Sequence, residues 1–358
     1  MTNFLRDILR QPQELERTLG HLRGPGGRDL QTAADAIRKA RHVYLTGMGS
    51  SWHAAFGAGA IFSRAGRPVY MQDAGELVQF ATFPAESVVI AISRSGRSAE
   101  IVHLLAKARE SGAIVVGITN AADGVLAQKA NFSILIPTLR DHAISVNTYS
   151  TLAVAAAALA CAVVDSFADQ LAASLRTAVA ETELRIPDWQ KQIAGNDWFA
   201  PGRIVHFLGR GGGLGSCHEA TLLWEEGAKS EATALGTGSF RHGPQEVVVK
   251  GSRFAIWIDG QNSREQDFSV ARDLRRLGAF VMLIGQNIPK DAGDLVFQLP
   301  GIPAEWQFMI DILPAQLAAE HLARISGVDC DSFRLCSYIV EDEYGLIGAE
   351  AAARKDRK

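Results

Sequence analysis

Serine and arginine residues gather behind an apolar run in the stretch VVIAISRSGRSAE, Val88–Glu100. Ser93, Arg94, Ser95 and Ser98 lie within six positions, around a single glycine. A loop that leaves a buried strand and enters a helix offers backbone N–H groups at the positive end of the helix dipole. Serine hydroxyls add hydrogen-bond donors, arginines add positive charge, and glycine lets an anion approach the backbone closely. These residues predict an anion site, and a phosphate group suits it well.

A second loop of the same composition follows an earlier apolar run. The stretch TGMGSSWHAA, Thr46–Ala55, contains Gly49, Ser50 and Ser51. Serine and glycine are also ordinary cap and turn residues, and for one loop alone this structural explanation is equally good. Two such loops at the ends of neighbouring strands favour one phosphate held from two sides. The corresponding loop of the second half, DGQNSRE, is acidic and poorer in serine, so we expect one phosphate site per chain.

Acidic residues and a histidine form the second group of candidates. Glu219 and Glu226 are seven residues apart, so in a helix they share one face. A carboxylate on a partly apolar face has a raised pKa, which suits a general base. His242 lies in the turn RHGP. The structural alternatives are that Glu219 forms a capping box with Ser216 at the helix start, and that His242 only stabilises its turn.

Short apolar runs alternate with helical patterns and must position these loops. In the first half the runs are His42–Gly47, Val88–Ser93, Ala113–Asn120 and Phe132–Pro137. Continuous β-branched runs of this length predict strands that are buried on both faces of a parallel sheet. In such a sheet ligands bind at the carboxyl ends of the strands, which is where both serine loops lie.

The same series recurs in the second half at an offset of about 163 residues. RIVHFLGRG repeats RHVYLTGMG, and SRFAIWIDGQNSRE repeats ESVVIAISRSGRSAE. This duplication predicts two tandem doubly wound α/β domains, with the boundary near the polar stretch Glu181–Asp197. We expect an N-terminal helical segment at 1–30, the two domains at 31–185 and 195–341, and a C-terminal tail at 342–358.

The composition is typical of a soluble globular protein. The chain has 358 residues, of which 47% are hydrophobic, and a net charge of −3, which gives no drive towards nucleic acid or anionic membranes. The apolar run Leu152–Val164 is shorter than the ~20 residues of a membrane span and predicts a buried helix. The four cysteines lack C-x-x-C spacing and the N-terminus lacks a signal peptide, so we expect reduced thiols in the cytoplasm. No metal-ligand or nucleotide-binding motif is present, and we expect neither a metal nor a cofactor.

The motifs GMGSSWHAA and SRSGRSAE resemble the serine loops of the sugar isomerase (SIS) domain. The tandem arrangement resembles the isomerase half of glucosamine-6-phosphate synthase, and also the related amino-sugar-phosphate deaminases and fructosamine-6-phosphate deglycases. The resemblance runs from about Leu30 to Glu341 and implies two flavodoxin-like, parallel-sheet SIS domains. It further implies a set of residues that bind the sugar's phosphate, in which an arginine replaces a frequent glutamine: Ser50, Ser51, Ser93, Arg94, Ser95 and Ser98.

The resemblance also implies roles in the second half, where EATLLWEE and RHGP match the glutamate and histidine motifs of the family. Glu226 would move a proton between C1 and C2 of the open-chain sugar, and His242 would aid ring opening or protonate a leaving group. In several relatives the histidine comes from the neighbouring subunit, which implies a homodimer with shared active sites. Further sugar contacts are implied at Gly49, Glu219, Ile144, Asn147 and Cys336.

The chain departs from the synthase pattern where that pattern has lysines. Leu223 replaces the lysine of the E-x-x-x-K motif, Asn147 and Thr148 replace a Thr-Lys pair, and Cys336 stands where a Schiff-base lysine is expected. No glutaminase domain with an N-terminal nucleophilic cysteine precedes the repeat. We therefore expect neither an amidotransferase nor a lysine–imine mechanism.

These features predict an enzyme that transfers a proton between C1 and C2 of a phosphorylated amino sugar or fructosamine and releases an amine, as deglycases and deaminases do. A simple aldose–ketose isomerase is the close alternative, because it shares the enediol intermediate. The alternative from another class is a sugar-phosphate sensor, which would bind its ligand and leave it unchanged. No basic recognition helix is visible, and we expect no nucleic-acid or membrane partner.

Overall fold

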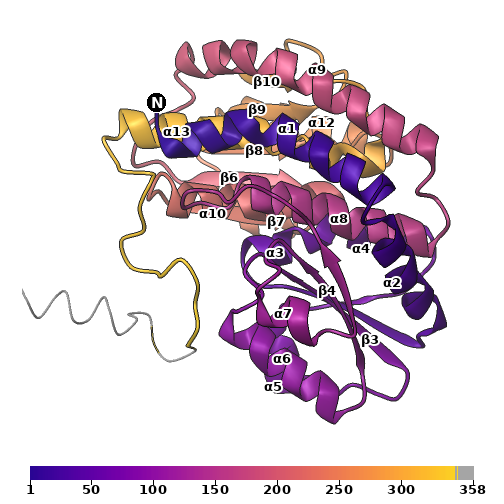
Figure 1. Ribbon diagram of the computed structural model, residues 1–358. Helices are drawn as coiled ribbons and strands as arrows, with labels where there is room; N and C mark the ends of the chain where they lie inside the picture. Colours follow the sequence, from indigo (N-terminus) through magenta and orange to yellow (C-terminus); the bar gives the residue numbers. More distant parts are fainter. Residues whose placement is uncertain (343–344, 346–358) are drawn as a thin grey trace, which may run out of the picture. The chain divides into compact units, whose positions relative to one another are not determined.

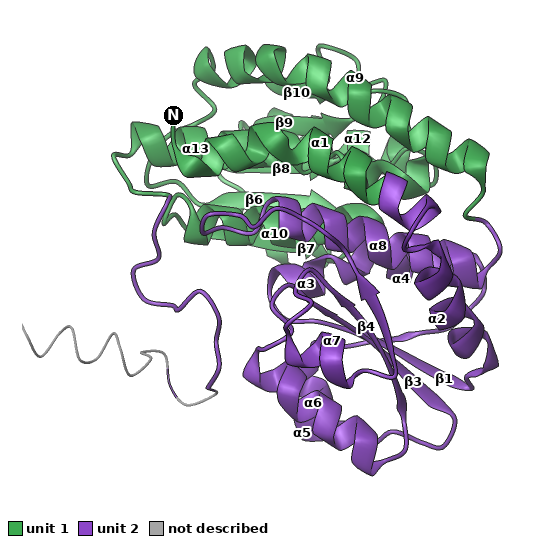
Figure 2. Ribbon diagram, viewed as in Figure 1, with its two compact units in different colours: residues 1–19, 167–330 green, residues 20–166, 331–358 purple. Residues whose placement is uncertain are grey.

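The chain divides into two compact units in the computed structural model, which describes residues 1–342 and 345 (Figure 2). Unit 1 comprises residues 1–19 and 167–330, and unit 2 comprises residues 20–166 and 331–358. Helix α1 (Asn3–Arg23) begins in unit 1 and ends in unit 2. The limits of the two units are set by contacts in space, whereas the domain ranges expected at 31–185 and 195–341 are set by the sequence repeat. The two divisions therefore describe different properties of the chain.

Unit 2 is built on a parallel sheet with the strand order β2-β1-β3-β4-β5 (Figure 1). Its strands are β1 (His42–Thr46), β2 (Tyr70–Met71), β3 (Ser87–Ser93), β4 (Ile114–Thr119) and β5 (Phe132–Leu135). Its helices are α2 (Gly27–Lys39), α3 (Ser50–His53), α4 (Ala55–Arg64), α5 (Ala74–Phe80), α6 (Ala99–Glu110), α7 (Val125–Lys129) and α8 (Asn147–Val163).

Unit 1 repeats this plan with a parallel sheet of order β10-β9-β8-β6-β7. Its strands are β6 (Val205–Gly209), β7 (Ala232–Gly236), β8 (Arg253–Trp257), β9 (Phe280–Gly285) and β10 (Leu295–Gln298). Its helices include α9 (Asp169–Ala194), α10 (Gly212–Glu226), α11 (Thr237–Phe240), α12 (Arg264–Arg276) and α13 (Leu313–Ile325), with 3-10 turns η1 (Pro244–Val247) and η2 (Ala304–Met309).

The predicted fold class is confirmed, because each unit is a doubly wound α/β structure with the flavodoxin-like strand order. The apolar runs expected to form strands all do so. Strands β2 and β7 were not predicted from the sequence, and each lies at the edge of its sheet. An edge strand is not covered by two neighbours and needs no continuous apolar run, and the residues of both strands are only partly buried or exposed.

The duplication is visible in backbone geometry as well as in sequence. Gly49 and Gly211 precede the helix that follows the first strand of their units, and they share the same dihedral angles, φ 52° and ψ −129°. Two residues earlier, a side chain on Gly47 would meet the Ser51 backbone at 2.6 Å, and one on Gly209 would meet the Cys217 sulfur at 2.7 Å. Both units therefore use a paired glycine turn that brings the following helix close against the first strand.

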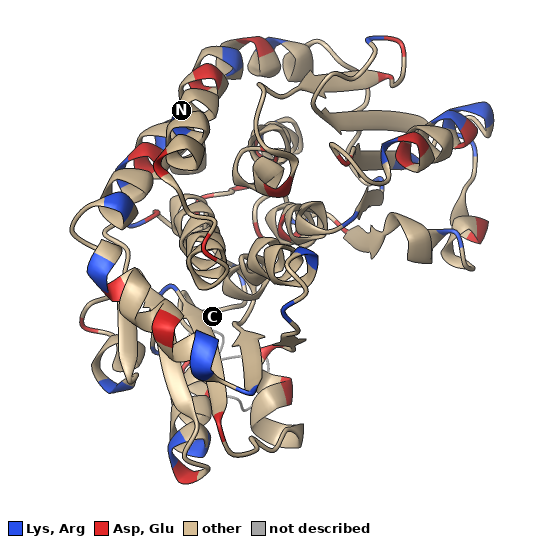
Figure 3. Ribbon diagram, turned by 90° about the vertical axis from the view of Figure 1, so that its right-hand side faces the viewer, with Lys and Arg blue, Asp and Glu red and all other residues tan. Residues whose placement is uncertain are grey.

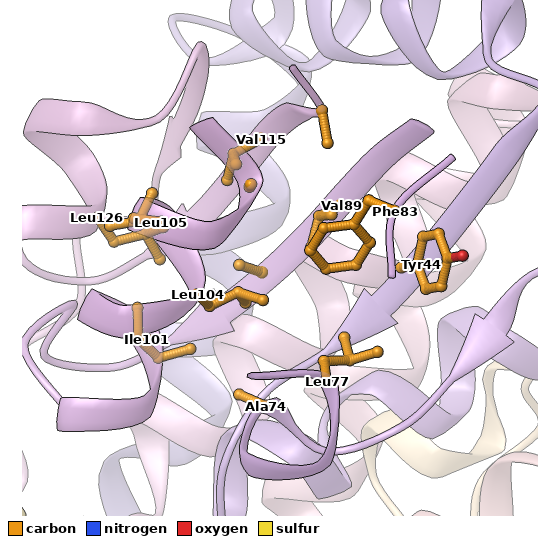
Figure 4. Close-up of a cluster of buried hydrophobic side chains, with 13 residues drawn as sticks. Tyr44, Ala74, Leu77, Phe83, Val89, Ile101, Leu104, Leu105, Val115 and Leu126 are labelled. Carbon is orange, nitrogen blue, oxygen red and sulfur yellow. The ribbon is translucent and has the colours of Figure 1, made fainter. Parts of the chain in front are cut away.

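The core on one face of the unit 2 sheet holds the segment that carries the first serine loop (Figure 4). Ile101, Leu104, Leu105 and Ala108 recur at helical spacing on α6 and are buried. They pack in one cluster with Val89 of β3 and with residues of β1, α5, β4 and α7. This packing fixes the N-terminus of α6 at the carboxyl end of β3.

Helix α8 is buried along its whole length, as the apolar run predicted. The stretch expected to hold the domain boundary is largely helical, because α9 continues through Pro187 to Ala194. Apart from the adjacent pair Ala178 and Val179, its buried residues follow one another at intervals of three or four from Ala172 to Ile193, which is the spacing of a helix packed on one side.

Charged residues are spread along the helices in both signs (Figure 3). Acidic and basic side chains alternate within short distances on α1, where Arg10 lies 2.9 Å from Asp7. None of the helices in the described part of the chain is both long enough and apolar enough to cross a bilayer.

Candidate functional site

The loop between β3 and α6 is folded around its own serines. Ser93, the last residue of β3, accepts a hydrogen bond from the Gly96 N–H at 3.0 Å, and Ser95 accepts one from the Arg97 N–H at 3.2 Å. Gly96 has φ +62°, the left-handed conformation that glycine adopts easily. Ser98 occupies the N-cap of α6, but its side chain makes no capping hydrogen bond. The hydroxyl of Ser98 therefore does not cap the helix.

The loop after β1 meets this loop directly. β1 and β3 are paired neighbours, with Thr46 opposite Ala91, so both loops emerge at the same end of the sheet. Ser51 accepts a hydrogen bond from the Arg94 N–H at 3.3 Å, and Ser51 is only 7% exposed. Ser50 begins α3 and is half-buried. The structure thus brings together the two serine loops that the sequence placed on neighbouring strands.

The guanidinium of Arg94 is half-buried and has neutral partners. It donates to the Ser145 hydroxyl at 2.8 Å and to the Tyr338 carbonyl oxygen at 2.7 Å, and its carbon lies 4.1 Å from the centre of the Tyr338 ring. Arg94 forms no ion pair within residues 1–342, whereas Arg97 pairs with Asp123 at the surface. A half-buried positive charge without a carboxylate beside it favours an anionic ligand.

The loop that leads into α8 is organised by a buried carboxylate. Asp141 accepts hydrogen bonds from the backbone N–H groups of Val146, Asn147 and Thr148, and from the side chains of Asn147 and Thr148. Asp141 therefore satisfies backbone N–H groups at the start of α8 from a position before the helix. Ile144 is 3% exposed. The sugar contacts expected at Ile144 and Asn147 stay predictions, and the Asn147 amide already donates to Asp141 at 2.7 Å.

Helix α10 in unit 1 carries both candidate glutamates. It begins at Gly212, so Ser216 and Glu219 lie inside the helix and the expected capping box is wrong. The glycine-rich turn starts the helix one turn earlier than the serine signal suggested, because Gly211 serves as the N-cap. Glu219 is fully buried, and Glu226, the last residue of α10, is half-buried.

His242 lies in a tight turn between α11 and η1. Its backbone N–H donates to the Ser239 carbonyl at 3.1 Å, Gly243 has φ 121°, and Pro244 opens η1. The side chain of His242 is exposed. The predicted turn is confirmed, and it presents the imidazole at the surface of unit 1.

The loop after β8 takes the place of the serine loop in the sequence repeat. Its backbone N–H groups donate hydrogen bonds to two carboxylates of unit 1, Asp259 and Asp267. Asp259 accepts hydrogen bonds from the N–H groups of Asn262 and Ser263, the latter at 2.7 Å. Asp267 of α12 is fully buried and accepts from the Asp259 N–H at 3.2 Å and from Arg210 at 3.0 Å. Burial raises the pKa of Asp267, and these hydrogen bonds lower it in part. Carboxylates of unit 1 therefore accept hydrogen bonds from the backbone of this loop, and a single phosphate site per chain, in unit 2, stays a prediction.

One buried acid of unit 1 was missed by the sequence analysis. Asp311 is fully buried, and one carboxyl oxygen accepts a hydrogen bond from the Ser216 hydroxyl at 2.5 Å. Burial raises the pKa of Asp311 from 3.8 to about 7, and hydrogen bonds from Ser216, Gln307 and Trp257 offset part of this rise. No sequence motif marks Asp311, which lies between η2 and α13 in an apolar stretch.

The predicted residues thus fall into two groups. The phosphate candidates and Gly49, Ile144, Asn147 and Cys336 belong to unit 2, and Glu219, Glu226 and His242 belong to unit 1. Cys336 is an exposed thiol. Among the described residues, no group of three or more His, Cys, Asp or Glu side chains is placed to hold a metal ion. The tail expected at 342–358 lies almost wholly outside the described residues. The sequence did not suggest the two hydrogen-bond partners of the Arg94 guanidinium, Ser145 and Tyr338.

Comparison with known proteins agrees with this architecture. Residues 36–163 match the model of the SIS domain family. The chain is 27% identical over 346 residues to glutamine–fructose-6-phosphate aminotransferase (isomerizing) of Pyrococcus horikoshii, a match that covers 92% of this chain and 56% of the relative. The chain thus spans about half the length of that curated relative.

Two solved structures share the fold of nearly the whole chain. The C-terminal domain of glucosamine-fructose-6-phosphate aminotransferase from Francisella tularensis has a TM-score of 0.83 at 20% identity, with 93% of this chain and 98% of that domain covered. Glucosamine-6-phosphate deaminase from Thermotoga maritima has a TM-score of 0.78 at 20% identity, with 95% and 99% covered. The resemblance drawn from the serine loops is confirmed, because residues 36–163 match the SIS domain, and the two parallel-sheet units share the fold of these solved structures.

Proposed function

We propose that this chain is an enzyme that acts on a phosphorylated amino sugar or fructosamine. The observation that carries the proposal is the pair of serine loops in unit 2, which are joined by the hydrogen bond between Ser51 and the Arg94 N–H. Beside them lies the half-buried guanidinium of Arg94, which has no acidic partner within residues 1–342. Backbone N–H groups, hydroxyls and a helix N-terminus are the donors that bind a phosphate group.

Within this proposal Glu226 is the proton carrier. It removes the proton from one of the carbons C1 and C2 of the open-chain sugar and returns it to the other, which shifts the carbonyl or imine along the chain. His242 donates a proton to the departing amine, and water supplies the oxygen that replaces it. The relatives support this class of reaction, because their names include an isomerizing aminotransferase and a glucosamine-6-phosphate deaminase.

A simple aldose–ketose isomerase is the second candidate, and it would need only Glu226 and the phosphate site.

We also propose a homodimer in which His242 serves the partner's site, since the imidazole is exposed at the surface of unit 1. Mixing a Glu226→Gln chain with a His242→Ala chain should then restore part of the activity that each variant lacks. Activity that remains absent after mixing would contradict shared sites.

The test is proton NMR in D₂O with fructose 6-phosphate, glucosamine 6-phosphate and a fructosamine 6-phosphate. We expect deuterium to enter C1 or C2 of one of these sugars, and we expect Glu226→Gln to abolish the exchange. Glu225→Gln is the matched control, because Glu225 is the exposed neighbour of Glu226 on α10. A free amine that appears with the label identifies deglycase or deaminase chemistry, and label without amine identifies an isomerase. Saturable binding without labelling would instead identify a sensor.

A further inference from the structure

The side chain of Arg210 joins two helices of unit 1 at the carboxyl end of β6. Arg210 directly follows β6, and its Nε donates to a carboxyl oxygen of Asp267 on α12 at 3.0 Å. Its Nη1 lies over α11, where a β-carbon added to Gly238 would come within 3.3 Å of it. The guanidinium therefore pairs with α12 through one nitrogen and covers the glycine of α11 with another.

A buried carboxylate fixes the position of this guanidinium. Asp267 is fully buried, and its second oxygen accepts hydrogen bonds from the Asp259 N–H and the Ser263 hydroxyl, each at 3.2 Å. Within residues 1–342, Arg210 is the basic side chain that pairs with Asp267. An unpaired carboxylate is costly in a protein interior, so this carboxylate retains its partner. The ion pair thus holds the guanidinium against α11.

Helix α11 is a single turn that leads into the His242 turn. The His242 N–H donates to the Ser239 carbonyl of α11 at 3.1 Å. Phe240, the last residue of α11, is buried and packs edge-on to Phe254 of β8, with ring centres 5.4 Å apart. A helix of four residues is not stable by itself and takes its place from its contacts. The Phe240 ring and the Arg210 guanidinium therefore both locate α11, and the backbone of the His242 turn follows it.

We propose that Arg210 is a positioning residue for His242, that it acts through α11, and that Asp267 holds it in place. This inference rests on the proposed function, because it assumes that His242 protonates the departing amine. Glu226 is independent of this arrangement. It ends α10, a helix of 15 residues that starts just after Arg210, so at about 1.5 Å per residue Glu226 lies about 20 Å along the helix. Loss of Arg210 should therefore impair the proton transfer by His242 and spare the one by Glu226.

The first experiment separates the two proton transfers in the D₂O assay. Arg210→Gln should slow amine release about 10- to 100-fold, because a displaced proton donor loses its alignment, and should change deuterium entry into the sugar less than about 3-fold. Arg210→Lys should recover only part of the rate, since lysine lacks the planar set of nitrogens that reaches both Asp267 and α11. Arg276→Gln is the matched control, because it breaks an exposed arginine–aspartate pair on α12. Equal losses in both rates, or normal amine release in Arg210→Gln, would overturn the inference.

A second variant tests the same contact without leaving Asp267 unpaired. Gly238→Ala keeps both charges and adds a methyl group 3.3 Å from the Nη1 of Arg210, so the guanidinium and α11 must move apart. It should slow amine release with the same selectivity. Gly236→Ala is its control, because the added carbon would meet the Ser239 hydroxyl at an ordinary distance of 3.6 Å. If Arg210→Gln fails to fold, normal amine release in Gly238→Ala decides against the proposal.

Amide hydrogen exchange of the peptide 237–244, followed by mass spectrometry, reports on α11 without any substrate. The peptide should exchange about 10-fold faster in Arg210→Gln and at the wild-type rate in Arg276→Gln. Unchanged exchange in Arg210→Gln overturns the inference, while labelling of a sugar and amine release by the wild type would still support the proposed function. If the wild type labels no sugar, or labels one without releasing amine, the role of His242 is refuted, and Arg210 is then an anchor of α11 without a catalytic consequence.

Discussion

Asp311 predicts a pH dependence of stability that can be worked out from the structure. The carboxyl is fully buried in unit 1, and burial raises its pKa from 3.8 to about 7. Between these values the folded state holds a proton that the unfolded state has lost. The contribution of Asp311 to the free energy of unfolding is therefore present below pH 4, decreases as the pH rises to 7, and is lost above it. A difference of about 3 pKa units corresponds to about 4 kcal/mol.

Asp311→Asn removes this titration at nearly constant volume. We expect the variant to gain stability relative to the wild type by about 4 kcal/mol between pH 4 and pH 8, because the wild type must bury a charge at the higher pH. Urea unfolding at a series of pH values, followed by tryptophan fluorescence, measures this difference. The signal reports mainly on unit 1, which holds five of the six tryptophans: Trp189, Trp198, Trp224, Trp257 and Trp306.

The control for this measurement is Asp273→Asn, which changes an exposed carboxylate on α12 of the same unit. Its side chain is 68% exposed, so water solvates the charge in both states and the pH profile should stay close to that of the wild type. The reasoning is refuted if the stability of Asp311→Asn runs parallel to that of the wild type across this pH range. A parallel profile would mean that the Ser216 hydroxyl and its neighbours stabilise the ionised carboxylate as well as water does.

Three further substitutions test how unit 2 positions the serine loops, each by urea unfolding followed by circular dichroism. Gly47→Ala places a methyl group 2.6 Å from the Ser51 backbone and should cost about 1–3 kcal/mol; a neutral result would show that α3 shifts freely. Asp141→Ala leaves buried N–H groups at the start of α8 without their acceptor and should lower the free energy of unfolding by about 3 kcal/mol or more. Asp141→Asn should restore part of this stability, whereas an equal loss in both variants would show that only the charge matters. Leu104→Ala empties the cluster under α6 and should cost about 2–5 kcal/mol, so a loss below 1 kcal/mol would contradict its place in the core.

Sequence reasoning succeeded where a feature is local. The strand runs and the glycine and serine turns at Gly49 and Gly96 are each encoded within a few neighbouring residues. The repeat extended this information to the second unit, because homologous turns adopt the same dihedral angles at Gly49 and Gly211. The meeting of the two serine loops also followed from the sequence, since neighbouring parallel strands end at one edge of the sheet.

Tertiary structure decided what depends on contacts between distant residues. Arg94 and Tyr338 are separated by 244 positions, and Ser216 and Asp311 by 95, so no periodicity or motif can pair them. The expected capping box at Ser216 and Glu219 failed because the glycine turn before it begins the helix earlier. The sequence by itself therefore determined the strands other than β2 and β7 and the composition of the loops at their ends. Only the fold determined which partner each charged side chain meets, because burial and electrostatic pairing arise after the chain has packed.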